Sequence, residues 1–234
     1  MTRPYVRYHM TVSIDQKVTG HFLDHAAVYT EEYYRMHRKY RHDGVQGFIC
    51  GRATMQSSFA GTAKPDTAKY EGRVCDRADR KAGDFAFYAV CFDTYGSLAW
   101  ESNTIFDEDP GYDNCHIIEV LSGQVSDAYL LYLQERNISY ILAGEDRIDI
   151  PLALEKLNAL FGIEDILLEG GGIIGGAFEA AGMIDELSFV VSPLIEGDAG
   201  RPVFAGLHRE TVSFWKTVEM RALEEGYVYR AVRQ

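Results

Sequence analysis

The stretch Asp165-Ile-Leu-Leu-Glu169-Gly170-Gly171-Gly172-Ile-Ile-Gly175-Gly176-Ala-Phe-Glu-Ala-Ala-Gly182 decides the fold of this chain. Its apolar residues 166–168 are typical of a short buried strand. Glu169 and three glycines follow, and residues 174–181 then predict a short helix that Gly182 ends. A strand that runs through glycines into a helix directs backbone N–H groups, and the positive end of the helix dipole, at one point.

Two interpretations of the three glycines stay open from this stretch alone. Without a Cβ they would let a phosphate approach the backbone, but they would serve equally well for packing in a tight turn. With Gly175 they satisfy G-x-G-x-x-G, whose Rossmann form needs an acidic residue about 20 positions later, at the end of the next strand. The next predicted strand, 187–191, ends in Ser192 and Pro193 instead. We therefore expect a dinucleotide turn that is not a Rossmann turn.

The composition bounds the class of protein. The chain has 234 residues, of which 47% are hydrophobic, so we expect one domain over residues 1–234 with a substantial core. The net charge of -12 argues against nucleic acid as a partner, because phosphate backbones require clusters of Lys and Arg. No apolar stretch is long enough to span a bilayer, and the N-terminus carries no apolar signal region.

The four cysteines stand singly, without any C-x-x-C pair. Cys50 and Cys91 lie inside apolar runs, so we expect them in the core. Single cysteines without a disulfide framework indicate a reducing compartment, and we expect a cytoplasmic protein.

The first predicted strand, 5–13, is followed by three polar residues at period two. If the strand continues, Ser13, Asp15 and Lys17 share one face. A hydroxyl, a carboxylate and an ammonium on one face would hold a polar substrate. The alternative is a solvated strand end with a local ion pair.

A second strand-to-helix junction begins with a glycine. Residues 45–50 predict a strand, which runs into Gly51, Arg52 and Thr54 at the start of a helix. The guanidinium fork and the hydroxyl would bind a phosphate. The alternative is a helix cap beside a surface arginine.

The remaining pattern alternates strands with helices. It predicts an α/β fold with a mainly parallel central sheet, flanking helices and a C-terminal antiparallel hairpin. The polar segment 59–84 is expected to be a long loop or an insertion. The other predicted elements are a helix beginning at a Thr30 cap and reaching residue 40, strands 85–92, 117–121 and 140–143, helices 126–136 and 150–161, and hairpin strands 213–220 and 227–232.

Several catalytic signatures are absent from the sequence. It lacks the H-x-E and P-C-x-x-C pair of zinc deaminases, the P-loop and the G-x-S-x-G nucleophile motif. No His and Cys cluster has metal spacing, so we expect no metal.

Together the motifs resemble a known family. They are, in order, S-x-D-x-K at 13–17, G-R-x-T at 51–54, D-x-x-G at 93–96 after a central strand, and E-G-G-G at 169–172, followed by a helix and D-E-L-S at 185–188. This order resembles the reductase domain of the riboflavin-pathway deaminase/reductase family, which has the dihydrofolate reductase fold. The resemblance extends over nearly the whole chain. The deaminase half is missing, so we expect a stand-alone, single-domain reductase.

The resemblance implies NADPH as cofactor and hydride transfer to C1′ of a phosphoribosylamino-pyrimidine, which opens the ribose to a ribityl chain. It places Gly51, Arg52 and Thr54 on the cofactor, with Arg52 near the adenosine 2′-phosphate. It likewise places Gly170, Gly171 and Gly172 at the pyrophosphate. A homodimer is implied in the same way.

The resemblance also implies the substrate face. Ser13, Asp15, Lys17 and Glu169 would face the small-molecule substrate, with Asp15, Lys17 and Glu169 as the catalytic groups. A carboxylate or the lysine would protonate the ring oxygen as the sugar opens, which is general acid catalysis. Apart from the family pattern, Arg38 or Arg41 would bind a substrate phosphate, and Arg41 is the one expected there; the alternative is that both are surface charges.

Two departures from the family pattern bear on the substrate. Gln16 stands where the family has a glycine, and Thr54 is not followed by the acidic residue and proline that lie beside the sugar phosphate. A dihydropterin or another small heterocycle is therefore a second hypothesis. A non-catalytic dinucleotide-binding protein is a third, and the presence of Ser13, Asp15 and Lys17 counts against it.

Overall fold

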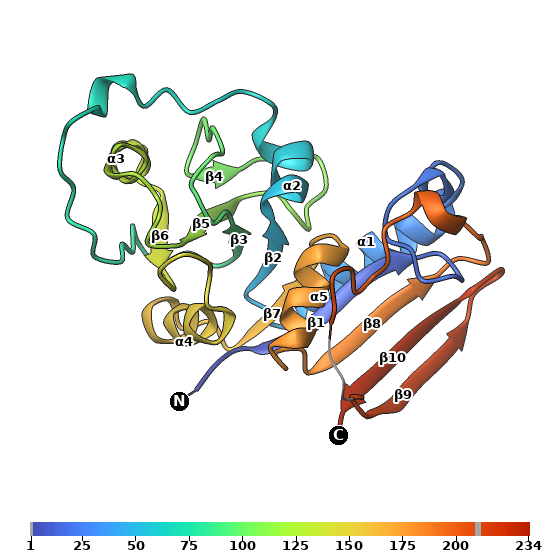
Figure 1. Cartoon of the computed structure of the whole chain (residues 1–234). Coiled ribbons are helices and arrows are strands. Elements are labelled where there is room, and N and C mark those ends of the chain that lie inside the picture. The colour runs from blue at the N-terminus through green and yellow to red at the C-terminus, as the bar shows by residue number, and fades with distance from the viewer. Residues whose placement is uncertain (1, 209–211) are drawn as a thin grey trace. The chain divides into compact units, whose positions relative to one another are not determined.

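The computed structural model describes residues 2–208 and 212–234, and these have the predicted α/β fold (Figure 1). They divide into two compact units, Met1–Pro4 with Gln46–Glu164 and Tyr5–Val45 with Asp165–Gln234, here called unit 1 and unit 2. The prediction of one domain over residues 1–234 stays a prediction. Within the described residues, no helix has both the length and the apolar composition needed to cross a membrane.

Unit 1 is built on four parallel strands. Their order is β2, β3, β5, β6, and the two-residue strand β4 joins β5 in the antiparallel sense. Helix α2 follows β2, α3 lies between β5 and β6, and α4 follows β6 (Figure 1). The bounds are β2 Gly47–Gly51, α2 Arg52–Met55, β3 Tyr88–Phe92, β4 Thr104–Ile105, β5 Cys115–Leu121, α3 Asp127–Glu135, β6 Ser139–Leu142 and α4 Ile150–Phe161.

Capping residues explain why the sequence predicted α3 and α4 well. The Ser126 hydroxyl accepts a hydrogen bond from the backbone N–H of Tyr129 at 3.2 Å. The Asp149 carboxylate accepts one from Leu152 at 3.1 Å, and Gly162 ends α4 with a left-handed φ of 69°. The strand predicted from residue 85 instead begins at Tyr88.

The polar segment 59–84 is tied to the rest of unit 1. The Arg77 guanidinium pairs with Asp127 at the start of α3. Arg80 exchanges backbone hydrogen bonds of 2.8 and 3.0 Å with Tyr140 on β6. The Tyr70 side chain is buried and its hydroxyl contacts Glu135. The segment therefore packs along α3 and β6.

Unit 2 is centred on the strand β1, which has parallel neighbours on both sides. Strand β7 pairs with one edge of β1 and β8 with the other. Strands β10 and β9 continue beyond β8 as the predicted antiparallel hairpin (Figure 1). The bounds are β1 Tyr5–Val12, α1 Ala27–His42, β7 Asp165–Leu168, α5 Gly172–Ala180, β8 Glu186–Val191, β9 Trp215–Ala222 and β10 Tyr227–Arg233.

The two long helices of unit 2 cover opposite faces of β1. The imidazole of His9 stacks on the Tyr33 ring of α1, with ring centroids 4.5 Å apart. The Tyr8 hydroxyl lies against Gly175 of α5. Successive residues of a strand point to opposite faces, so α1 and α5 lie on either side of the strand.

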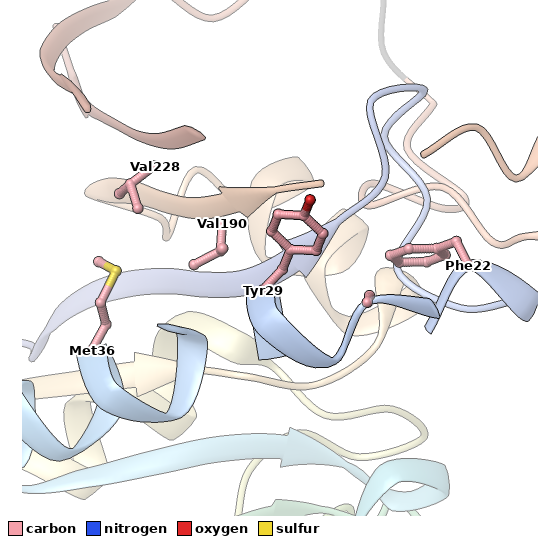
Figure 2. Close-up of a cluster of buried hydrophobic side chains, with 6 residues drawn as sticks. Phe22, Tyr29, Met36, Val190 and Val228 are labelled. Atoms are coloured by element: carbon pink, nitrogen blue, oxygen red, sulfur yellow. The ribbon is translucent and has the colours of Figure 1, made fainter. Parts of the chain in front are cut away.

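An apolar cluster fixes α1 on the strands of unit 2. Tyr29 and Met36 from the helix meet Val190 of β8 and Val228 of β10 (Figure 2). Thr30 is not the cap that the sequence predicted, because α1 already begins at Ala27 and its N-cap, Ala26, makes no side-chain hydrogen bond. The buried face of the helix, and not a hydroxyl cap, sets its start.

Candidate functional site

The residues Ser13 to Lys17 form a turn and not a continued strand. Strand β1 ends at Val12, the Gln16 N–H donates to the Ser13 carbonyl at 2.9 Å, and the Ser13 N–H donates to the Lys17 carbonyl at 3.0 Å. Gln16 adopts a left-handed φ of 61°. The predicted shared strand face of Ser13, Asp15 and Lys17 is therefore wrong, because the chain reverses here before period two can apply.

The Asp15 carboxylate anchors this turn. It accepts hydrogen bonds from the Ser13 hydroxyl at 2.7 Å and from the backbone N–H groups of Glu196 at 3.1 Å and Gly197 at 2.9 Å. The Ser13 hydroxyl and the two N–H donors stabilise the charged form and lower the pKa of Asp15 to about 2. At neutral pH this carboxylate holds no proton to donate.

Lys17 is held in the turn by its backbone, whereas Asp15 is held by its side chain. The backbone N–H of Lys17 donates to the Ser13 hydroxyl at 2.9 Å, and the residue forms a bridge with Pro202. The side chain is half-buried, and its ammonium is the cationic group of this turn.

A segment that the sequence did not single out, residues 194–205, holds the turn in place. It also reaches the start of α5, because the Ala205 N–H donates to the Gly172 carbonyl at 3.0 Å. The Tyr8 hydroxyl donates to the Val203 carbonyl at 2.8 Å. The backbone bonds between the segment and the turn are Ile14 N–H to Leu194, Val18 N–H to Arg201 and Val203 N–H to Gln16, each 2.9 Å long.

The glycine stretch forms the predicted strand, turn and helix. Helix α5 begins at Gly172 with Gly171 as its N-cap, and Gly182 follows the helix with a left-handed φ of 68°. A Cβ on Gly172 would overlap the carbonyl oxygen of Pro202, and one on Gly176 would overlap that of Ala205. The close contact with Pro202 therefore requires a glycine at position 172, which is also the first residue of the helix.

Glu169 lies between β7 and this helix, and it is paired with a histidine. Nδ1 of His37 on α1 lies 2.7 Å from Oε1 of Glu169, and the side chains are 0% and 1% exposed. A second imidazole, His9, is also buried. Burial lowers the pKa of His9, and the negative charge of Glu169 offsets part of this lowering. Sequence reasoning missed His37, since a single histidine in a helix carries no distinguishing signal.

The strand register places Glu169 and Ser13 at different heights along β1. Tyr8 is opposite Leu168, so Glu169 lies at the level of His9, four residues before Ser13. At about 3.3 Å per residue this is a separation of roughly 13 Å along the strand. Arg41 is half-buried one helical turn after His37, on the same side of α1.

The second junction lies in unit 1 and has the predicted form. Strand β2 ends at Gly51, which is the N-cap of the four-residue helix α2, and a single π-helical turn over 56–60 continues it. Arg52 is exposed and donates from Nη1 to Oε1 of Gln56 at 2.7 Å. The Thr54 carbonyl accepts from the Ser57 hydroxyl at 3.1 Å. Phosphate binding by Gly51, Arg52 and Thr54 stays a prediction.

The D-x-x-G motif after β3 is a structural turn. The Asp93 carboxylate accepts hydrogen bonds from the N–H groups of Ser97 and Leu98, the latter at 3.2 Å. Gly96 has a left-handed φ of 69°, and a Cβ there would overlap the Tyr129 ring. All four cysteines are free and buried, which confirms the core positions of Cys50 and Cys91.

Solved structures confirm the fold. The riboflavin biosynthesis reductase Rib7 of Saccharomyces cerevisiae aligns over 99% of this chain and 90% of its own, with a TM-score of 0.64 and 15% identity. A diaminohydroxyphosphoribosylaminopyrimidine deaminase/5-amino-6-(5-phosphoribosylamino)uracil reductase of Thermotoga maritima aligns over 99% of this chain and 57% of its own, with a TM-score of 0.61 and 17% identity. The fold is therefore the dihydrofolate reductase-like α/β fold that the motif order predicted.

Sequence comparisons identify the family. Over 57 residues the chain is 37% identical to the 2,5-diamino-6-ribosylamino-4(3H)-pyrimidinone 5′-phosphate reductase of Methanothermobacter thermautotrophicus, a match that covers 24% of this chain and 26% of that protein. The family model of the RibD C-terminal domain matches residues 4–229. This chain belongs to the RibD C-terminal domain family.

Proposed function

We propose that this protein is an NADPH-dependent reductase of riboflavin biosynthesis, which converts the ribosyl group of a phosphoribosylamino-pyrimidine to a ribityl chain. The observation that carries the proposal is the buried Glu169 directly before the glycine start of α5, within a chain that matches its family over residues 4–229. The pyrimidinone phosphate reductase activity of the Methanothermobacter relative supports this substrate class.

The residues present are compatible with a dinucleotide. Gly170 and the N-cap Gly171 lead directly into Gly172, the first residue of α5, and α5 has nine residues, enough for a helix dipole. In unit 1, the exposed Arg52 offers its guanidinium to the 2′-phosphate, beside Gly51 and Thr54. When bound, the reduced nicotinamide supplies the hydride.

The protein's own groups would bind the sugar and move one proton. Hydride addition at C1′ breaks the bond from C1′ to the ring oxygen O4′, and that oxygen must take a proton. We assign this proton to the Lys17 ammonium, because Asp15, with a pKa of about 2, is already deprotonated and fixed in its turn. Glu169 would bind the pyrimidine, Ser13 would help to hold the turn, and Arg41 would contact the substrate phosphate.

A second candidate is reduction of another small heterocycle, such as a dihydropterin. One observation favours it: Thr54 is not followed by the acidic residue and proline that lie beside the sugar phosphate in the family pattern. The two candidate substrates differ because the phosphoribosylamino-pyrimidine carries a phosphate for Arg41 to bind, whereas a pteridine carries none.

Homodimer assembly is part of the proposal. Strand β9, at the end of the strand order, has two exposed apolar side chains, Val218 and Met220, which are 48% and 68% exposed. An unpaired edge with an apolar face is suited to a second copy of this chain.

The experiment that tests the proposed function follows product formation by the Glu169→Gln variant. The purified protein is given NADPH with 2,5-diamino-6-ribosylamino-4(3H)-pyrimidinone 5′-phosphate, or in a separate reaction with a dihydropterin, and the reduced product is measured by mass spectrometry. We expect the variant to bind NADPH as the unaltered protein does and to lose turnover. Unchanged turnover would make Glu169 structural, and product from a dihydropterin alone would favour the second candidate.

A further inference from the structure

Glu169 and His37 form a pair in which His37 is fully buried and Glu169 keeps 5% of its surface exposed. A carboxylate removed from water is stable only with a hydrogen-bonding or charged partner. The Nδ1 atom of His37, 2.7 Å from Oε1, is such a partner. It comes from a different element, α1, so the pair joins the end of β7 to the helix that covers β1 and β8.

The helix that carries His37 is itself fixed. Met36, the preceding residue, lies in the apolar cluster with Tyr29 and Val190 (Figure 2). The imidazole therefore approaches Glu169 from a rigid support. A glutamate side chain has three rotatable bonds, and a partner held in place restricts them. The hydrogen bond thus sets the orientation of the carboxylate as well as its stability.

The other histidine near Glu169 has different partners. Nδ1 of His9 lies 3.0 Å from both the carbonyl and the hydroxyl oxygen of Ser188, and its Nε2 lies 3.1 Å from the Tyr33 carbonyl. These bonds orient its ring toward β8 and α1. His37, in contrast, places its Nδ1 on Oε1 of Glu169 at 2.7 Å.

We propose that His37 is a positioning residue, which holds the carboxylate of Glu169 in the orientation that pyrimidine recognition and turnover require. The inference rests on the proposed function and adds to it a residue that no motif of the sequence marks. His37 acts through Glu169 and has no contact of its own with the substrate in this proposal.

Two substitutions separate positioning from mere packing. In His37→Asn the side-chain amide keeps an N–H close to the place of Nδ1, whereas in His37→Gln the N–H moves to the place of Nε2. We expect His37→Asn to keep kcat within about threefold and His37→Gln to lower kcat on the order of 100-fold, as misplacement of a reacting geometry by about 1 Å does. The dissociation constant of NADPH should stay unchanged in both variants.

The matched controls are His42→Asn and His42→Gln, because His42 lies on the same helix and its side chain is 89% exposed. Both should behave as the unaltered protein. Equal kcat values for the two His37 variants would overturn the proposal that His37 positions the carboxylate of Glu169. Absence of turnover in the unaltered protein would instead overturn the proposed function.

A second measurement does not depend on the fold of the His37 variants. In ¹⁵N-histidine spectra of the unaltered protein, we expect an Nδ1–H proton that is protected from solvent exchange, and we expect its resonance to shift in Glu169→Gln. A protein without a protected Nδ1–H, or one whose protected resonance is unmoved in Glu169→Gln, would contradict the pairing and with it the proposal.

Discussion

The Cα of Gly172 faces the carbonyl oxygen of Pro202 so closely that no Cβ fits between them. Pro202 also pairs with Lys17 through a β-bridge. The segment 194–205 is therefore in direct contact with both the start of α5 and the turn that carries the candidate proton donor. The position of Lys17 relative to the first turn of α5 depends on this contact.

The first prediction concerns this contact. We expect Gly172→Ala to lower the free energy of unfolding by about 1–3 kcal/mol, because the methyl group would force the Pro202 backbone away from the helix. Urea unfolding measures the change. Ile173→Ala, at a site that is 61% exposed on the same helix, is the control and should change it far less. Equal losses in the two variants would mean that the close approach is not a constraint.

The second prediction concerns Gln16, whose φ of 61° lies in the left-handed region. A side chain there is disfavoured by roughly 1–2 kcal/mol, while glycine loses about 0.5–1 kcal/mol through its freer unfolded chain. We expect Gln16→Gly to raise the free energy of unfolding by up to about 1 kcal/mol, measured by urea unfolding. Gln16→Ala, which keeps the Cβ, should change little. A loss of stability in Gln16→Gly would contradict the turn geometry.

The third prediction concerns pH and Glu119, which is fully buried on β5 with its Oε1 bonded to the Trp100 indole N–H. Burial, with the nearby charge of Asp93, raises the pKa of Glu119 well above its ordinary value. The folded protein keeps this proton while the unfolded chain loses it, so stability falls as pH rises above about 4.5 toward the folded pKa.

Urea unfolding between pH 5 and pH 9 tests the role of Glu119. We expect Glu119→Gln to reduce the fall in stability with pH, because the amide cannot ionise. Glu101→Gln is the control, since Glu101 is exposed. The same pH slope in Glu119→Gln as in the unaltered protein would show that Glu119 is not the group responsible.

The sequence predicted those parts of the molecule whose determinants are local. Helix α4 was predicted to its bounds, because Asp149 caps its start and Gly162 ends it within a few residues of chain. Both glycine-led junctions were predicted for the same reason, since β2 ends directly at α2 and only residues 169–171 separate β7 from α5.

Long-range contacts explain what the sequence could not predict. The turn at 13–17 is held by bonds to a segment about 180 residues away, through Glu196 and Gly197, and period two alone suggested a strand. Nothing near His37 in the sequence indicates Glu169, which is 132 positions later. For the same reason the sequence did not show that Asp15 anchors the turn through these backbone partners, and its catalytic role stays a prediction.

The fourth prediction concerns cofactor choice. We expect Arg52→Ala to weaken NADPH binding by roughly tenfold or more and to leave NADH binding nearly unchanged, because only NADPH carries the 2′-phosphate. Calorimetric titration with each nucleotide measures this. Arg73→Ala, at another exposed arginine of unit 1, is the control. Equal weakening of the two cofactors would remove the 2′-phosphate role of Arg52.

The fifth prediction separates Lys17 from Asp15 in proton transfer. We expect Lys17→Met to lower kcat by about 100-fold, which is within the range for loss of a general acid, with NADPH affinity maintained. Asp15→Asn should mainly lower the melting temperature, because its carboxylate anchors Glu196 and Gly197. Steady-state kinetics and thermal unfolding of both variants measure the effects. A kcat loss confined to Asp15→Asn, in a protein that melts normally, would reverse the assignment.

The central claim is that this protein is an NADPH-dependent pyrimidine reductase. Calorimetric titration of the purified protein with NADPH and with NADH tests it most directly. The phosphoribosylamino-pyrimidine is then added while the absorbance of the reduced nicotinamide is recorded. We predict tight NADPH binding, weaker NADH binding and a fall in absorbance once the pyrimidine is added. Binding of NADPH without any oxidation would contradict the pyrimidine as substrate. Failure to bind either nucleotide would contradict the reductase account as a whole, since both glycine-led junctions would then be purely structural.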